Sequence, residues 1–138
     1  MITLTDQMRE MVDHALDNGC PCIIATSSAK GEPDIGYKGS MMVFDGESLA
    51  YWERTRRQHL KNLLENPHVV VLFRDPKTRI NWRFHGVATI HEKGAIRDQV
   101  MARTVKAELE KDAERKGSAV IIRVDKVTNL AGEVLQTR

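Results

Sequence analysis

The chain has 138 residues, of which 41% are hydrophobic and 29% charged, and its formal net charge is +2. A chain of this length can bury roughly 70% of its unfolded surface, so residues 1–138 are expected to form a single domain without disulfides or structural metal. The composition excludes a disordered chain, a coiled coil, a collagen-like repeat and a disulfide scaffold. So small a net charge is no argument for binding nucleic acid or an anionic membrane.

The start of the sequence shows no targeting signal. Its first residues, Met1-Ile-Thr-Leu-Thr-Asp-Gln-Met, lack a basic segment followed by an apolar run. No apolar stretch approaches the ~20 residues that are needed to span a bilayer. We therefore expect a cytoplasmic protein that does not enter membranes.

Periodicity and turn signals divide the chain into helices and strands. In chain order they predict a helix over 5–18, strands over 22–28, 34–44 and 49–52, a helix over 56–65, strands over 69–73 and 80–91, a helix over 95–110 and a strand over 118–126. Thr5 or Asp6 is expected to cap the first helix. The residues after 126 are expected to form a short tail.

Most neighbouring strands are joined by short turn signals such as Ala29-Lys30-Gly31 and Asp45-Gly46. Such connections indicate a mainly antiparallel sheet. Six strands of this kind avoid exposed edges by closing into a small closed or split barrel. We therefore predict a mainly β fold with flanking helices, built on a six-stranded antiparallel split β-barrel.

Cys20 and Cys22 flank a proline, a spacing that suits neither a zinc site nor a thioredoxin-type pair. Cys22 opens an apolar run and is expected to be a small core residue. A redox role for the pair is the alternative.

Three arginines, Arg54, Arg56 and Arg57, stand at the start of the helix over 56–65. Their charges oppose the positive end of the helix dipole, where acidic residues are favoured. A phosphate held by free backbone N–H groups, the arginines and the Thr55 hydroxyl would offset that cost. The alternative is that these arginines are solvated and paired with Glu47, Glu53 or Asp45.

A second candidate anion site is the segment Gly36-Tyr37-Lys38-Gly39-Ser40. Its glycines allow the backbone to approach a ligand, while Lys38 and Ser40 offer a charge and a hydroxyl. An irregular edge strand is the alternative interpretation. Both segments flank the hairpin over 41–52, which is expected to bring them together.

Arg83 is a third candidate, because it lies opposite in phase to Trp82 and Phe84 on its strand. It must reach an anion, another acceptor or solvent. The five histidines show no metal-ligand spacing, and no nucleophile, paired-carboxylate or phosphate-loop motif occurs. Any chemistry is therefore expected to come from a bound cofactor.

Several short segments between residues 21 and 90 follow a familiar order. They are Ala25-Thr26, Gly31-Glu32-Pro33, Lys38-Gly39-Ser40, Asp45-Gly46, Tyr51-Trp52, Asn62-Leu63-Leu64-Glu65-Asn66-Pro67 before the next strand, and Arg83-Phe84-His85-Gly86. Together they resemble the pyridoxamine 5′-phosphate oxidase-like, FMN-binding split-barrel family. The resemblance implies a homodimer with FMN at the subunit interface.

The resemblance also implies the residues that would bind the cofactor. Carried over by position, the phosphate would be held by Lys38, Ser40, Thr55, Arg56, Arg57 and Gln58, with Gly39 between the first two and with Trp52 and Arg83 near the flavin. No catalytic residue is assigned.

The leading hypothesis is an FMN-dependent oxidoreductase that transfers hydride between the flavin and an unidentified small molecule. The C-terminal Arg-Leu segment of the true oxidase has no counterpart after residue 118, so oxidation of pyridoxamine 5′-phosphate itself is not expected. The alternatives are a non-enzymatic, stress-related flavin-binding protein and a split barrel that binds haem or the deazaflavin F420. A nucleic-acid module is disfavoured by the balanced charge.

Overall fold

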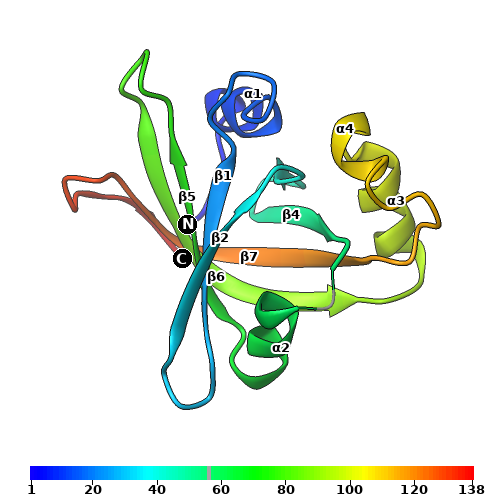
Figure 1. Cartoon of the computed structure of the whole chain (residues 1–138). Helices are drawn as coiled ribbons and strands as arrows, with labels where there is room; N and C mark the ends of the chain where they lie inside the picture. Colours follow the sequence, from blue (N-terminus) through cyan, green and yellow to red (C-terminus); the bar gives the residue numbers. More distant parts are fainter. Residues whose placement is uncertain (56) are drawn as a thin grey trace.

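Eight strands in the described part of the chain form one antiparallel sheet that curls on itself (Figure 1). The computed structural model describes residues 1–55 and 57–138. The strands are β1 (Cys22–Ser27), β2 (Pro33–Lys38), β3 (Met42–Val43), β4 (Ser48–Glu53), β5 (His68–Arg74), β6 (Asn81–His91), β7 (Ser118–Thr128) and β8 (Val134–Thr137). Their order is β2-β1-β5-β6-β7-β4-β3, with β8 paired to β7. The mainly β, antiparallel split-barrel architecture is thus confirmed.

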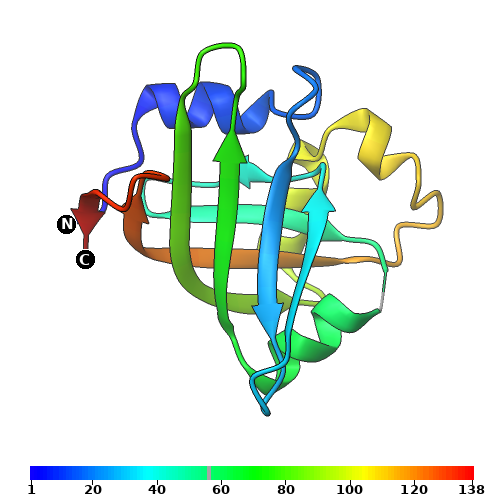
Figure 2. The same cartoon turned by 60° about the vertical axis from the view of Figure 1, so that its left-hand side comes forward.

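The curl places the strands in two crossing layers (Figure 2). In this view β2, β1, β5 and the first part of β6 stand upright in front, and β7 and β4 cross behind them. A bulge between His85 and Gly86 interrupts the β6–β7 register, and a Cβ at Gly86 would collide with the carbonyl oxygen of Arg123. The main core includes Ile24, Tyr51, Val71, Phe84, Val120 and Cys22, the last as expected.

Two features raise the strand count from the predicted six to eight. The stretch over 34–44 is not continuous, because a turn in which the Met41 amide donates to the Lys38 carbonyl at 3.2 Å separates β2 from β3. The tail after residue 126 forms β8, which pairs with the end of β7. This last strand is short and mostly exposed, so its sequence carries no buried alternation that could reveal it.

The helices of the described part lie outside the sheet, and they are α1 (Asp6–Asp13), α2 (Gln58–Glu65), α3 (Ala95–Arg103) and α4 (Lys106–Leu109). Thr5 caps α1, as predicted, by accepting a hydrogen bond from the Met8 amide. The single helix predicted over 95–110 is wrong: Thr104 and Val105 have extended backbone angles and separate α3 from α4. Consecutive β-branched residues have low helix propensity.

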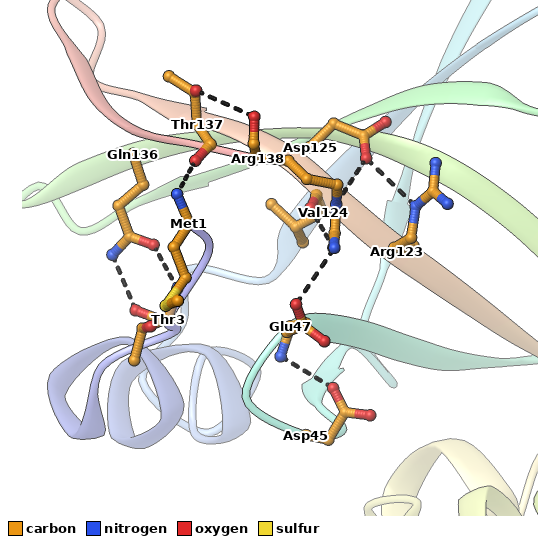
Figure 3. Close-up of polar contacts among 10 residues, drawn as sticks. All are labelled: Met1, Thr3, Asp45, Glu47, Arg123, Val124, Asp125, Gln136, Thr137 and Arg138. Atoms are coloured by element: carbon orange, nitrogen blue, oxygen red, sulfur yellow. Dashed lines mark hydrogen bonds and ion pairs between the residues drawn. The ribbon is translucent and has the colours of Figure 1, made fainter.

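The two ends of the chain meet beside β7 (Figure 3). Thr3 and Gln136 exchange two hydrogen bonds, each 2.8 Å long. The Arg138 guanidinium donates to Asp125 at 3.2 Å and to Glu47 at 3.1 Å. These contacts tie β8 to the barrel.

One face of β2, β1 and β5 has no helix of the described residues over it (Figure 2). Ile23, Ala25, Ile35, Val70, Leu72 and Arg83 line a shallow depression of about 240 Å³ on this side. We call these residues, with the neighbouring Tyr37, the outer face. Ile35 is 69% and Tyr37 is 71% exposed, so large apolar side chains are left facing water.

Candidate functional site

One cleft collects the two segments that flank the β3–β4 hairpin. It has a volume of about 240 Å³ and is lined by Leu16, Pro21, Tyr37, Lys38, Gly39, Ser40, Trp52, Glu53, Arg54, Thr55, Glu108 and Lys111. The expectation that this hairpin brings the segments together is therefore confirmed for Lys38, Gly39, Ser40, Trp52 and Thr55. Below, "the cleft" means this site.

A buried ion pair forms one wall of the cleft. The Lys38 ammonium donates to the Glu53 carboxylate at 2.6 Å, and the two side chains are 14% and 2% exposed. The Thr55 hydroxyl donates to the second Glu53 oxygen at 3.3 Å. Lys38 also lies 5.4 Å from the centre of the Tyr51 ring. Lys38 and Thr55 therefore border the cleft and are held by Glu53, which the sequence suggested only as a partner of the arginines.

Ser40 connects the turn after β2 to β4. Its hydroxyl donates to the Trp52 carbonyl at 3.2 Å and accepts from the Trp52 amide at 3.0 Å. The single donor of this hydroxyl is thus committed to the main chain. Ser40 shapes the cleft, and it offers no proton to an anion.

Trp52 lies on the opposite side of β4 from the main core, beneath the segment that follows α3. Its indole N–H donates to Asp112 at 2.9 Å, and the Arg97 guanidinium stacks 4.8 Å from its ring centre. Burial alone would raise the pKa of Asp112, but hydrogen bonds from the Lys116 amide, the Trp52 indole and the Gly117 amide outweigh it and lower this pKa. The indole thus anchors the end of that segment beside the cleft.

The outer part of the cleft is charged on both sides. Glu108 on α4 lies 3.9 Å from Arg54 and 3.6 Å from Lys111. A Cβ at Gly39 would collide with the Glu108 carboxylate, so the glycine permits this approach. The cleft is consequently not a purely cationic pocket: three basic side chains face two acids, Glu53 and Glu108.

The start of α2 lies next along the chain from the cleft. Arg57 occupies the N-cap position without a side-chain cap, and the first turn of α2 contains no acidic residue. Gln58 is exposed and donates to Asn62 at 2.7 Å, so it supports the helix itself. Arg56 lies outside the described residues.

Behind α2, a small polar network closes the end of the barrel. The Thr26 hydroxyl is hydrogen-bonded to His59 at 2.8 Å and accepts from Asn62 at 3.0 Å. A Cβ at Gly36 would lie 2.8 Å from His59, so the absence of a side chain there seats the imidazole. This network fixes α2 relative to β1 and β2, and thereby fixes the position of the helix start.

Arg83 is separated from the cleft. It belongs to the outer face and donates to the Leu130 carbonyl at 3.3 Å. Its neighbour His85 lines a second depression on that side, together with His68. Burial and the charges of Lys126 and Arg83 lower the pKa of His85. Within one chain, Arg83 therefore does not join the other predicted cofactor residues.

The sequence analysis missed Glu108 and Asp112, and it named Glu53 only as a possible partner of the arginines and not of Lys38. Glu53 had a detectable signal, because it shares a strand phase with Leu49 and Tyr51 and so had to point inward. Glu108 and Asp112 had none, since only the tertiary fold brings α4 and the following turn to the cleft.

In the described part of the chain, no group of His, Cys, Asp or Glu is placed to hold a metal ion. Among the helices of residues 1–55 and 57–138, none is long and apolar enough to cross a membrane.

Comparisons with solved structures agree with this architecture. HupZ from Group A Streptococcus is 28% identical, with a TM-score of 0.75 over 96% of this chain and 98% of that one. HutZ, a heme storage protein from Vibrio cholerae, shares the fold at 17% identity, with a TM-score of 0.70 over 95% of this chain and 97% of its own. An FMN-binding protein from Syntrophomonas wolfei subsp. wolfei does so at 12% identity, with a TM-score of 0.70 over 90% and 86%.

A search of the curated proteins found no match. The family model described as pyridoxamine 5′-phosphate oxidase matches residues 4–130, which include every strand from β1 to β7 and all four helices described above. This protein therefore belongs to the pyridoxamine 5′-phosphate oxidase family, whose fold is the FMN-binding split barrel.

Proposed function

We propose that this protein binds FMN and acts as an oxidoreductase on a small molecule. The observation that carries the proposal is the meeting of Lys38 and Thr55 at one cleft, beside a helix start that has neither a side-chain cap nor an acidic first turn. Free N–H groups at a helix start, basic side chains and a hydroxyl suit a phosphate.

The residues of the chain fit the two ends of such a cofactor differently. The phosphate would be held by Thr55, Arg57 and the amides at the start of α2, with Arg56 as a further expected ligand. The flat ring system would lie along the cleft, whose walls include Tyr37 and Trp52. Bound FMN would supply hydride transfer, and the protein would orient it and exclude water.

We also propose that two copies of the chain form the working molecule. Pockets that enclose ligands of this size usually measure about 300–1,000 Å³, more than the cleft of one chain provides. The outer face leaves Ile35 and Tyr37 exposed beside the cleft, because Tyr37 borders both. A second copy on the outer face would cover this apolar surface and place a partner surface near the ligand.

The test is to purify the protein, record its visible spectrum and titrate it with FMN while following flavin fluorescence. We expect a flavin spectrum or saturable binding of added FMN. Arg56→Ala combined with Arg57→Ala should weaken binding by about tenfold or more, since each charged hydrogen bond is worth about 1.5–3 kcal/mol. Lys93→Ala, which removes an exposed charge after β6, is the matched control and should bind as the parent does. A colourless protein that fails to bind added FMN would refute the proposal.

The same preparation separates the alternatives. A haem protein shows a Soret band, and a deazaflavin protein binds F420 in preference to FMN. If FMN binds but no nicotinamide or other electron donor reduces it, the non-enzymatic flavin-binding alternative is favoured over an oxidoreductase.

A further inference from the structure

Glu108 occupies an unusual place for an acid in a protein that binds a phosphate. It comes from α4, a single turn with no fully buried residue, yet its own side chain is only 15% exposed. The carboxylate reaches over Gly39, at the turn that joins β2 to β3, and lines the cleft. The Glu108 carboxylate is therefore a negative charge of the protein itself, in the same cleft in which we expect the phosphate of the ligand.

The two basic side chains at the outer part of the cleft are both engaged by this carboxylate. Arg54 lies 3.9 Å from one Glu108 oxygen, and Lys111 lies 3.6 Å from the other. Glu53 plays a different part, because it is 2% exposed and locked to Lys38 within the wall. Glu108 is thus the acid whose contacts are loose enough to be exchanged for those of a ligand.

The chain around α4 is tied at its two ends, and Leu109 of α4 packs against the core cluster that contains Trp52. Before α4, the Thr104 hydroxyl is tied to the Val100 carbonyl at 2.7 Å. After it, Asp112 accepts from the Trp52 indole at 2.9 Å and from the Gly117 amide at 2.8 Å. With the helix held in this way, the Glu108 side chain can change rotamer without breaking these contacts.

We propose that Glu108 is an internal competitor for the anionic end of the ligand, and so determines which ligands the cleft accepts. This inference rests on the proposed flavin function. In the free protein Glu108 neutralises Arg54 and Lys111. A phosphate held beside Thr55 can pair with the adjacent Arg54 only by displacing the carboxylate, and a neutral ligand need not displace it. Glu108 therefore lowers the affinity for phosphorylated ligands selectively, and it sets the energy needed to open the outer part of the cleft.

The test compares FMN with riboflavin, which lacks the phosphate, at low ionic strength. Glu108→Gln keeps the shape of the side chain and removes its charge. We expect this variant to bind FMN about tenfold more tightly and riboflavin within about twofold of the parent. Glu110→Gln is the matched control, because Glu110 is on the same short helical segment, is 62% exposed and pairs with Lys106 away from the cleft. It should change neither affinity.

Several outcomes would overturn the inference. Equal changes for FMN and riboflavin would mean that Glu108 acts through packing, and weaker FMN binding by Glu108→Gln would mean that the acid positions the basic groups. If the parent and the variant bind no flavin, the proposed function fails, and inorganic phosphate then serves as the probe. Greater thermal stabilisation of Glu108→Gln than of the parent by phosphate supports competition, and equal stabilisation contradicts it.

Discussion

The cleft and the outer face meet at Tyr37 on β2, but they collect different kinds of side chain. In the cleft, charged groups are paired within the chain: Lys38 with the buried Glu53, and Arg54 and Lys111 with Glu108. On the outer face, apolar groups such as Ile35 and Tyr37 are exposed with nothing in the chain to cover them. The charges of the cleft are thus paired within one chain, whereas the apolar outer face is the surface on which we propose that a second copy docks.

The largest expected effect comes from disrupting the proposed subunit contact on the outer face. Ile35→Asp would place a charge within the proposed subunit contact, twice in a symmetric dimer. We expect the dissociation constant of the dimer to rise about a thousandfold, which corresponds to a loss of binding free energy on the order of 4 kcal/mol. Sedimentation at several protein concentrations measures this constant. Leu64→Asp, at a residue that is 75% exposed on α2, is the control and should leave association unchanged. If Ile35→Asp associates as the parent does, another surface forms the dimer.

The next effect breaks the pairing inside the cleft. Lys38→Met keeps most of the side-chain volume but leaves Glu53, 2% exposed, without its charged partner. Removing one member of a buried pair costs about 3 kcal/mol or more, and we expect that loss in the free energy of unfolding by urea. Lys106→Met removes an exposed partner of Glu110 and should cost less than about 1 kcal/mol. Similar losses in both variants would show that burial does not distinguish the pairs.

The third prediction concerns Tyr51, whose buried hydroxyl is an exception to the pairing of polar groups near the cleft. The Tyr51 hydroxyl is buried and has no hydrogen-bond partner among the described residues, and burial followed by the charge of Glu53 raises the pKa of Tyr51. Tyr51→Phe should therefore leave the free energy of unfolding unchanged or raise it by about 1 kcal/mol. Ser40→Ala, which removes a hydroxyl bonded at 3.0 and 3.2 Å, should lower it by about 1–2 kcal/mol. Destabilisation by Tyr51→Phe would reveal an additional partner for the hydroxyl.

The smallest effect concerns pH. Because the pKa of Asp112 is lowered in the folded protein, its ionised form stabilises the fold above the ordinary value of 3.8, and this contribution is lost as pH falls through the lowered value. Asp112→Asn should therefore be less stable than the parent at pH 7, and the difference should shrink in strong acid. Unfolding curves at pH 7 and near pH 3 check this. A difference that stays constant over that range would assign the loss to packing.

Local patterns were enough for most of the fold. Alternation and turn residues located β1, β5 and β6 almost to the residue, and Thr5 is one of the two residues expected to cap the first helix. These features depend on contacts within a few positions of the chain. They fail where local preference is weak, as at Thr104 and Val105 between α3 and α4, and in the exposed strand β8.

The sequence predicted only part of the candidate site, because local patterns do not show which distant segments meet. Lys38 and Thr55 stood out because their segments join a glycine-rich turn and a cationic helix start, and both border the cleft. Arg83 was grouped with them, yet within one chain it belongs to the outer face. Strand phase had placed it opposite Trp82 and Phe84, but phase does not say which surfaces two chains share.

The sequence by itself determined a small antiparallel barrel, its family and the segments that border its cleft, since periodicity, turns and short motifs are properties of neighbouring residues. The charge of that cleft was decided only by the tertiary structure. Glu53 meets Lys38 from another strand, and Glu108 reaches Arg54 from a helix more than fifty residues later in the chain. A net charge of +2 over the whole chain says nothing about such pairings, because folding, and not composition, chooses which charges are brought together.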